Sequence, residues 1–167
     1  MNDHTLRVMT ATGIGERETP QDLFDQLNAE FHFGLDAAAD EVNHKCDRWL
    51  GPGGLVPDAL APDVNWHVLA EGKPIWLNPP YGRGVEAWLG TAHAMALFFG
   101  ATVVVLLPAR TDTEWFHELV IPYAAEIRFL RGRLRFSGME AGAPFPSMVV
   151  VYRPQHEGKY RWARWAR

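Results

Sequence analysis

The tetrapeptide Asn78-Pro79-Pro80-Tyr81, which follows the short apolar run 75–77, restricts the fold of this chain more than any other feature. Each proline fixes its own φ angle and has no N–H, so neither can extend a β-ladder. The residue before a proline is also driven out of the helical region. The sequence therefore predicts a strand that ends in a stiff loop, at the edge where open α/β sheets place their ligands.

The residue types in this loop suit the recognition of a flat amine. The Asn78 side-chain oxygen and the Pro79 carbonyl are two acceptors for an amine with two N–H groups, and the Tyr81 ring can stack on a planar base. Asn-Pro and Pro-Pro also occur in ordinary surface turns. A plain turn does not require an amide, two prolines and an aromatic ring together, so we interpret the loop as functional.

Bulk composition indicates one globular domain. The chain has 167 residues, of which 47% are apolar, enough for a substantial core. It has no apolar stretch of membrane-spanning length, and its first residues lack the charged and apolar regions of a signal peptide. Cys46, the single cysteine, cannot form an internal disulfide, which indicates a reducing cytoplasm. The His residues are scattered rather than spaced as zinc ligands, so we expect no metal.

The net charge of −4 hides a strong asymmetry. Residues 1–127 hold 7 Lys+Arg and 18 Asp+Glu, a balance of −11, whereas residues 128–167 hold 9 and 2, a balance of +7. A basic segment of this kind can bind the phosphates of a nucleic acid while the rest of the chain stays acidic. Its arginines could instead line exposed strand edges. We favour the phosphate interpretation.

The pattern along the chain predicts alternating helices and strands. A helix of about a dozen residues is expected from Thr19, with Thr19 as N-cap, Pro20 in the first helical position and Asp22 reaching back as in a capping box. Its free N–H groups can also hold an anion. The other expected elements are a short strand ending at Asp36, short helices at 43–50 and 114–119, a helix at 84–99 ended by Gly100, a central strand at 101–107, and strands at 127–130, 133–136 and 148–152.

Three segments allow more than one interpretation. Asp36 and the small residues after it can approach a ribose or an ammonium group, although they lack a G-x-G-x-x-G pattern, and a solvated strand end explains Asp36 equally well. The tail 159–167 alternates cations with aromatic rings, which suits either nucleic-acid contact or packing on the domain. Residues 40–72 form an irregular stretch whose length indicates a functional loop or an unrecognised element.

Six segments occur in a distinctive order: Thr19-Pro20, Phe33–Ala39 with Asn43 and Cys46, Trp76–Gly82, Val104–Phe116, Gly132–Phe136 and Phe145–Val151. In this order they resemble the small phage-type DNA adenine methyltransferases, the Dam-like family within the NPPY amino-methyltransferases. The resemblance covers about residues 18–153.

The resemblance implies an α/β fold, a Rossmann-like S-adenosylmethionine-dependent methyltransferase built as a compact three-layer sandwich. Its mostly parallel sheet would end in an antiparallel hairpin. The implied reaction is methylation of the exocyclic amine of adenine in double-stranded DNA, after the base flips into the NPPY loop. By position, the catalytic residues are Asn78, Pro79, Pro80 and Tyr81, and the cofactor-binding residues are Thr19, Pro20, Asp36, Ala37 and Asp58.

The basic segment and the loop after residue 107 supply the expected DNA contacts, which are Arg110, Arg131, Arg133 and Arg135, with Arg128 as a further candidate. We expect an N-terminal arm at 1–15, a methyltransferase domain at 16–154 and a basic, aromatic tail at 155–167. The expected location is the cytoplasm of a bacterial host, if a phage or prophage encodes the chain. Methylation of RNA or of a protein glutamine, or a non-catalytic nucleic-acid-binding role, are the alternatives.

Overall fold

The computed structural model describes residues 18–136, 142–154 and 161–165. Six strands form one sheet in the order β1-β2-β3-β5-β4-β6. Their bounds are Leu35–Asp36 (β1), Ile75–Leu77 (β2), Val103–Pro108 (β3), Glu126–Leu130 (β4), Ser147–Tyr152 (β5) and Arg161–Trp165 (β6). The helices are α2 (Gln21–Phe31), α3 (Trp66–Leu69), α4 (Val85–Phe99) and the π-helix η2 (Phe116–Val120).

The sheet is mostly parallel, with one reversed strand. β1, β2 and β3 are parallel neighbours, and Ile75 on β2 lies opposite Leu35 on one side and Val103 on the other. β5 is antiparallel to both β3 and β4, so β4 runs in the direction of β3. The predicted antiparallel pair is therefore present as β4 and β5, but it does not end the sheet. β6, from the segment expected to be a tail, continues the sheet parallel to β4.

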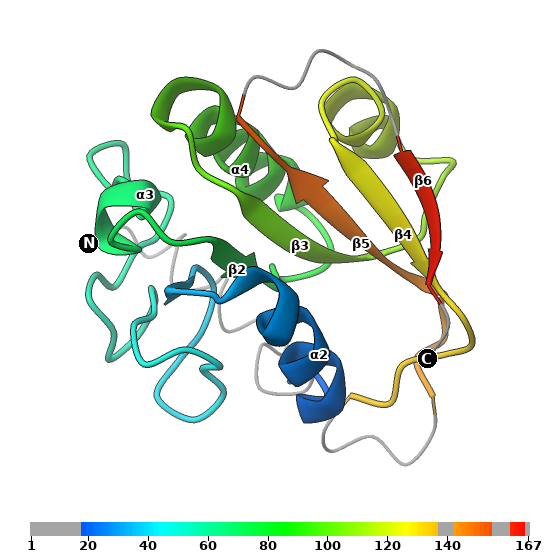
Figure 1. Cartoon of the computed structure of the whole chain (residues 1–167), viewed down its shortest axis with the longest axis horizontal. Coiled ribbons are helices and arrows are strands. Elements are labelled where there is room, and N and C mark those ends of the chain that lie inside the picture. The colour runs from blue at the N-terminus through cyan, green and yellow to red at the C-terminus, as the bar shows by residue number, and fades with distance from the viewer. Residues whose placement is uncertain (1–17, 137–141, 155–160, 166–167) are drawn as a thin grey trace.

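Helices cover both faces of the sheet, as Figure 1 shows. On one face α2 contributes Leu23, Phe24 and Leu27 to a core with Trp76 and Val104. On the other face α3, α4 and η2 pack on the alternate side chains of the same strands. Because both faces are covered, all six residues of β3 are buried, as its continuous apolar run predicts. A sheet covered by helices on both faces is the α/β architecture that the sequence predicts.

Several predicted elements are confirmed. The helix expected at 84–99 is α4, and Gly100 ends it in the left-handed region at φ 74°, where a glycine costs little. The strand at 127–130 lies within β4, and the strand at 148–152 lies within β5. The helix expected at 114–119 is present as two α-helical residues followed by η2. Among the described helices, none has the length and apolar character needed to cross a membrane.

Two predicted elements are wrong. Residues 43–50 form turns and an isolated bridge rather than a helix, because they run along the outer edge of β1. There the Asp36 N–H donates to the Arg48 carbonyl, and the Leu50 N–H donates to the Asp36 carbonyl. Residues 133–136 alternate between exposed and buried as a strand would, but they pair with no strand in the described part of the chain.

Candidate functional site

Three loops and the start of one helix meet at a single edge of the sheet. β1, β2 and β3 are parallel, so their C-terminal ends share this edge. The residues found there are Asp36 at the end of β1, Asn78 just after β2 and Ala109 just after β3. Thr19, immediately before α2, reaches the same edge through a hydrogen bond to Asn78. Residues predicted from separate motifs are thus brought together.

The Asn78 side chain is held between two hydroxyl groups. Its Nδ2 donates to Thr19 Oγ1 at 3.1 Å, and its Oδ1 accepts from the Tyr81 hydroxyl at 2.8 Å. The same hydroxyl lies 3.4 Å from the Leu106 carbonyl oxygen on β3. In the structure the oxygen of the Asn78 amide therefore faces Tyr81 and its nitrogen faces Thr19.

Thr19 does not cap α2, which corrects the sequence prediction. The cap position of α2 is Pro20, and no side chain caps the helix there. The Pro20 carbonyl accepts the Phe24 N–H at 3.1 Å. Thr19 is 3% exposed, and its hydroxyl is directed to Asn78 instead. A tertiary contact has therefore replaced the local contact that the sequence suggests.

The Asp36 carboxyl is buried at the end of β1 and organises the loop that follows. It is 2% exposed. Its Oδ2 accepts the Lys45 N–H at 3.0 Å, and its Oδ1 accepts the Ala38 N–H at 3.3 Å. Burial raises the pKa of this carboxyl to about 7, against the opposing effect of these N–H groups and of the nearby His44 and Lys45. Its contact with a cofactor stays a prediction.

The raised pKa of Asp36 predicts that stability depends on pH. In the unfolded chain this carboxyl loses its proton near its ordinary pKa of 3.8, but in the folded protein it does so only near 7. As the pH rises from about 4 to about 7, the unfolded state releases a proton first, and the contribution of Asp36 to the free energy of unfolding falls. Urea titrations at several pH values should show this fall in the wild type and not in Asp36→Asn. Parallel curves for the two proteins would contradict it.

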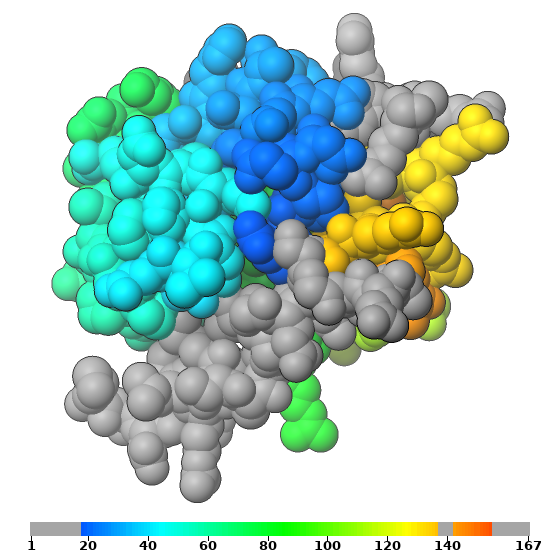
Figure 2. Space-filling view, turned by 90° about the horizontal axis from the view of Figure 1, so that it is seen from below, coloured from blue at the N-terminus to red at the C-terminus, as the bar shows by residue number. Residues whose placement is uncertain are grey.

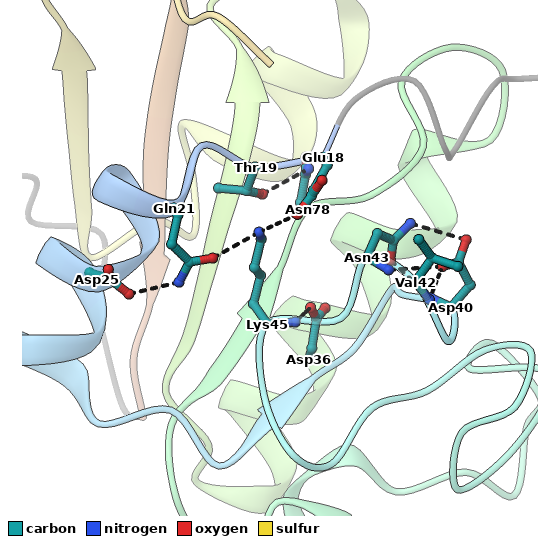
Figure 3. A network of polar contacts seen from close by, with 10 residues as sticks. All are labelled: Glu18, Thr19, Gln21, Asp25, Asp36, Asp40, Val42, Asn43, Lys45 and Asn78. Carbon is teal, nitrogen blue, oxygen red and sulfur yellow. Dashed lines mark hydrogen bonds and ion pairs between the residues drawn. The ribbon is translucent and has the colours of Figure 1, made fainter. Parts of the chain in front are cut away.

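A buried lysine, which the sequence analysis missed, joins the start of α2 to the loop after β1. The Lys45 ammonium lies 2.6 Å from Glu18 Oε1 and 3.0 Å from Gln21 Oε1, and Figure 3 draws both contacts as dashed lines. The Lys45 side chain is only 6% exposed. Because its backbone N–H binds Asp36, this one residue connects β1 with α2. Its partners lie 24 and 27 positions away, so no local pattern could have revealed them.

Aromatic side chains surround the Tyr81 ring. Phe145 and Phe136 meet it nearly edge-on, with centroid distances of 5.7 and 6.3 Å. The Arg110 guanidinium lies 5.8 Å from the centroid of Phe145. Beside these rings is a pocket whose lining consists of Tyr81, Gly82, Val85, Pro108, Arg110 and Trp115. The two phenylalanines come from the connection between β4 and β5. Phe136 lies in a segment predicted to be a strand, and no sequence pattern indicated that either ring lies beside Tyr81.

Comparison with known proteins identifies the chain. A family model described as DNA N-6-adenine-methyltransferase (Dam) matches residues 15–161. The chain belongs to this family. The chain is therefore a member of a methyltransferase family, as the order of its sequence motifs predicted. No curated protein matches the chain. Among solved structures it is similar to one described as a predicted O-methyltransferase from Agrobacterium tumefaciens, at 22% identity and a TM-score of 0.34, over 55% of this chain and 39% of that protein's length.

The arginines of this Dam-family chain fall into two groups. Arg131, Arg133 and Arg135 are exposed in the segment after β4, and Arg110 is exposed after β3. In Figure 2 the segment after β4 (yellow) and the segment around residues 40–60 (cyan) lie on either side of the blue residues at the start of α2. Arg128, by contrast, is 6% exposed and paired with Glu30 and Glu126. The expectation that Arg128 contacts nucleic acid is therefore wrong.

The structure also gives the surroundings of the remaining residues that were predicted to bind the cofactor or to act in catalysis. The buried Ala37 donates its N–H to the Trp76 carbonyl at 2.9 Å. Asp58 Oδ1 accepts the Leu60 N–H at 3.0 Å within a turn, and no described contact joins it to Asn78. Pro79 is buried and Pro80 is half-buried directly after Asn78. Within the described residues, no three His, Cys, Asp or Glu side chains are grouped so as to hold a metal ion.

Proposed function

We propose that this chain transfers a methyl group from S-adenosylmethionine to the exocyclic amine of adenine in double-stranded DNA. The observation that carries the proposal is the orientation of Asn78. Its oxygen is held by Tyr81 and its amino group by Thr19, at the C-terminal edge of a mostly parallel sheet, in a chain of the Dam family. A fixed acceptor at this edge suits an amine substrate.

The NPPY loop positions and activates the target nitrogen. Adenine leaves the duplex at a cost of a few kcal/mol, and the Tyr81 ring stacks on it. Asn78 Oδ1 and the Pro79 carbonyl accept hydrogen bonds from the two amine N–H groups. These hydrogen bonds direct the nitrogen lone pair away from the ring and towards the methyl donor. The amide oxygen has a second lone pair, so it can accept the amine while the Tyr81 hydroxyl stays close. Methyl transfer would form a bond from nitrogen to the methyl carbon as the bond from that carbon to the sulfonium sulfur breaks, leaving a neutral thioether, and the methylated amine would then lose a proton to solvent.

The residues beside this loop fit S-adenosylmethionine by their chemistry. The amino-acid end of this cofactor carries both an ammonium and a carboxylate group. Asp36 supplies a buried carboxyl and Lys45 an ammonium, and a hydrogen bond from the Lys45 backbone N–H joins the two residues. Small residues follow β1, where Ala37 and Ala39 are buried. When bound, the cofactor supplies a methyl group on a sulfonium, so the protein needs no covalent nucleophile, and its task is placement.

The exposed arginines provide the proposed DNA interface. Phosphate contacts release counterions, so the logarithm of the DNA-binding constant falls linearly with the logarithm of the salt concentration. We expect Arg131→Gln, Arg133→Gln and Arg135→Gln each to reduce the magnitude of this slope by about 1, as measured by fluorescence anisotropy on a duplex. Lys73→Gln is the matched control, because it removes one exposed charge just before β2, at the opposite edge of the sheet. Slopes unchanged in all three arginine variants would place the DNA elsewhere.

Incubation of the protein with labelled S-adenosylmethionine and unmethylated DNA, followed by nucleoside analysis, tests the reaction. We expect the label in N6-methyladenine, and sequencing of the same DNA then gives the recognition site. Parallel incubations replace the DNA with RNA or with a protein that carries a candidate glutamine, and label that appears only in one of these would overturn the proposed substrate. If calorimetry detected no cofactor binding and no substrate were labelled, the non-catalytic alternative would hold.

A further inference from the structure

The contact between Thr19 and Asn78 has no role in building α2. The two residues are 59 positions apart, and Thr19 leaves the helix without a side-chain cap. Thr19 is almost fully buried, so its hydroxyl lies in a protected environment, where hydrogen bonds are strong. The start of α2 thus contributes a polar group directly to the loop after β2.

Two features of the neighbouring residues restrict the position of Thr19. The preceding residue, Glu18, forms an ion pair with the buried Lys45, and the following residue, Pro20, has a restricted φ angle. Lys45 is in turn tied by its backbone N–H to Asp36. In Figure 3 Glu18 and Thr19 lie beside Asn78, and the Lys45 side chain extends from the side of Asp36 towards Glu18 and Gln21. The Thr19 hydroxyl is therefore presented by a rigid segment.

The orientation of the Asn78 amide decides whether it can accept a hydrogen bond from an amine. If the amide rotated by half a turn, its N–H groups would exchange places with its oxygen and face the amine protons. A hydroxyl can donate or accept, so the Tyr81 hydroxyl alone does not prevent this rotation, whereas with Thr19 in place both hydroxyls would have to reverse their roles before the amide could rotate. Thr19 provides a second, separate contact at the amino end of the amide.

We propose that Thr19 is a positioning residue that holds the Asn78 amide with its oxygen towards the target amine. This inference rests on the proposed function, and it assigns Thr19 a role different from binding the cofactor. A residue that only positions Asn78 affects the chemical step, whereas a cofactor ligand affects cofactor affinity. The two roles are therefore separable by experiment.

The test compares Thr19→Val, Thr19→Ser and Thr102→Val. Valine keeps the shape of threonine without its hydroxyl, serine restores the hydroxyl, and Thr102 lies before β3 at the opposite edge of the sheet. In Thr19→Val we expect kcat to fall roughly 10-fold or more while the Kd for S-adenosylmethionine, measured by calorimetry, changes less than about 2-fold. Thr19→Ser should recover most of kcat, and Thr102→Val should match the wild type.

A second measurement reports on the amide itself, independently of activity. The side-chain N–H₂ signals of Asn78 in a nitrogen–proton NMR spectrum can be assigned by their loss in Asn78→Asp. We expect Thr19→Val to shift them and to speed their exchange with solvent, and Thr102→Val to leave them unchanged. Unaltered Asn78 signals, or a weaker cofactor affinity with normal kcat, would overturn the role of Thr19. A wild type that methylates no DNA would instead refute the proposed function.

Discussion

Asn78→Ala is expected to reduce kcat for methyl transfer about 100- to 1,000-fold, which is the scale seen when an aimed polar group is removed from a reacting centre. The alanine side chain has no oxygen to accept a hydrogen bond from the amine, so the nitrogen lone pair stays conjugated with the adenine ring. The Kd for S-adenosylmethionine should change less than about 2-fold, because the amide acts on the other substrate. Single-turnover assays with labelled cofactor, together with calorimetry, measure the two effects separately.

Asn78→Asp is the informative companion to this variant. A carboxylate keeps oxygen acceptors for the amine but no longer donates to Thr19 Oγ1, although the Thr19 hydroxyl can donate to it instead. We expect activity between that of the wild type and that of Asn78→Ala. Near-normal turnover in Asn78→Ala would mean that the target nitrogen is activated by another group, and the mechanism would fail.

The sequence predicted where the NPPY loop lies, because the residues that determine its position are those of the loop and of the strand just before it. Proline cannot pair in a ladder, and the apolar residues before it have to be buried, so a strand ending at Leu77 follows directly. The same holds for α4, which ends at a glycine in the left-handed region. These elements needed no knowledge of the rest of the molecule.

The network around Asn78 could not be predicted in this way. Thr19 has every local property of an N-cap, and only the position of Asn78 across the sheet edge explains why its hydroxyl points elsewhere. Likewise Lys45 and Glu18 each look like solvated charges in the sequence. Their pairing depends on how α2 and the loop after β1 pack together, which is a tertiary effect.

The segment after β4 shows a different limit. The alternation of Arg133, Leu134, Arg135 and Phe136 predicted which side chains are buried, and the structure has this pattern. Burial with a period of two does not create a strand unless a neighbour is available for pairing. Here the Leu134 carbonyl accepts one hydrogen bond, from the Ala143 N–H at 2.7 Å.

Arg128→Met is expected to lower the free energy of unfolding by about 2–3 kcal/mol, and the melting temperature by roughly 5–10 °C. The buried guanidinium donates two hydrogen bonds of 2.6 Å to Glu30 and two, of 2.8 and 3.1 Å, to Glu126. Methionine keeps the apolar stem but leaves the two carboxylates facing each other without their cation. The value is below that for a fully buried pair because the Glu30 side chain is 44% exposed.

The dependence of this effect on pH separates lost charge pairing from lost packing. Hydrogen bonding to Arg128 lowers the pKa of Glu30 below its ordinary 4.5, so the stability that the pair adds is present above that pH and is lost as the pH falls below it. The difference between wild type and Arg128→Met should therefore shrink in acid, whereas a packing defect would persist. Arg135→Met, an exposed change of the same kind, should cost little stability. Because Arg128 is buried, its replacement should also leave the salt slope of DNA binding unchanged, in contrast to the exposed arginines that follow β4.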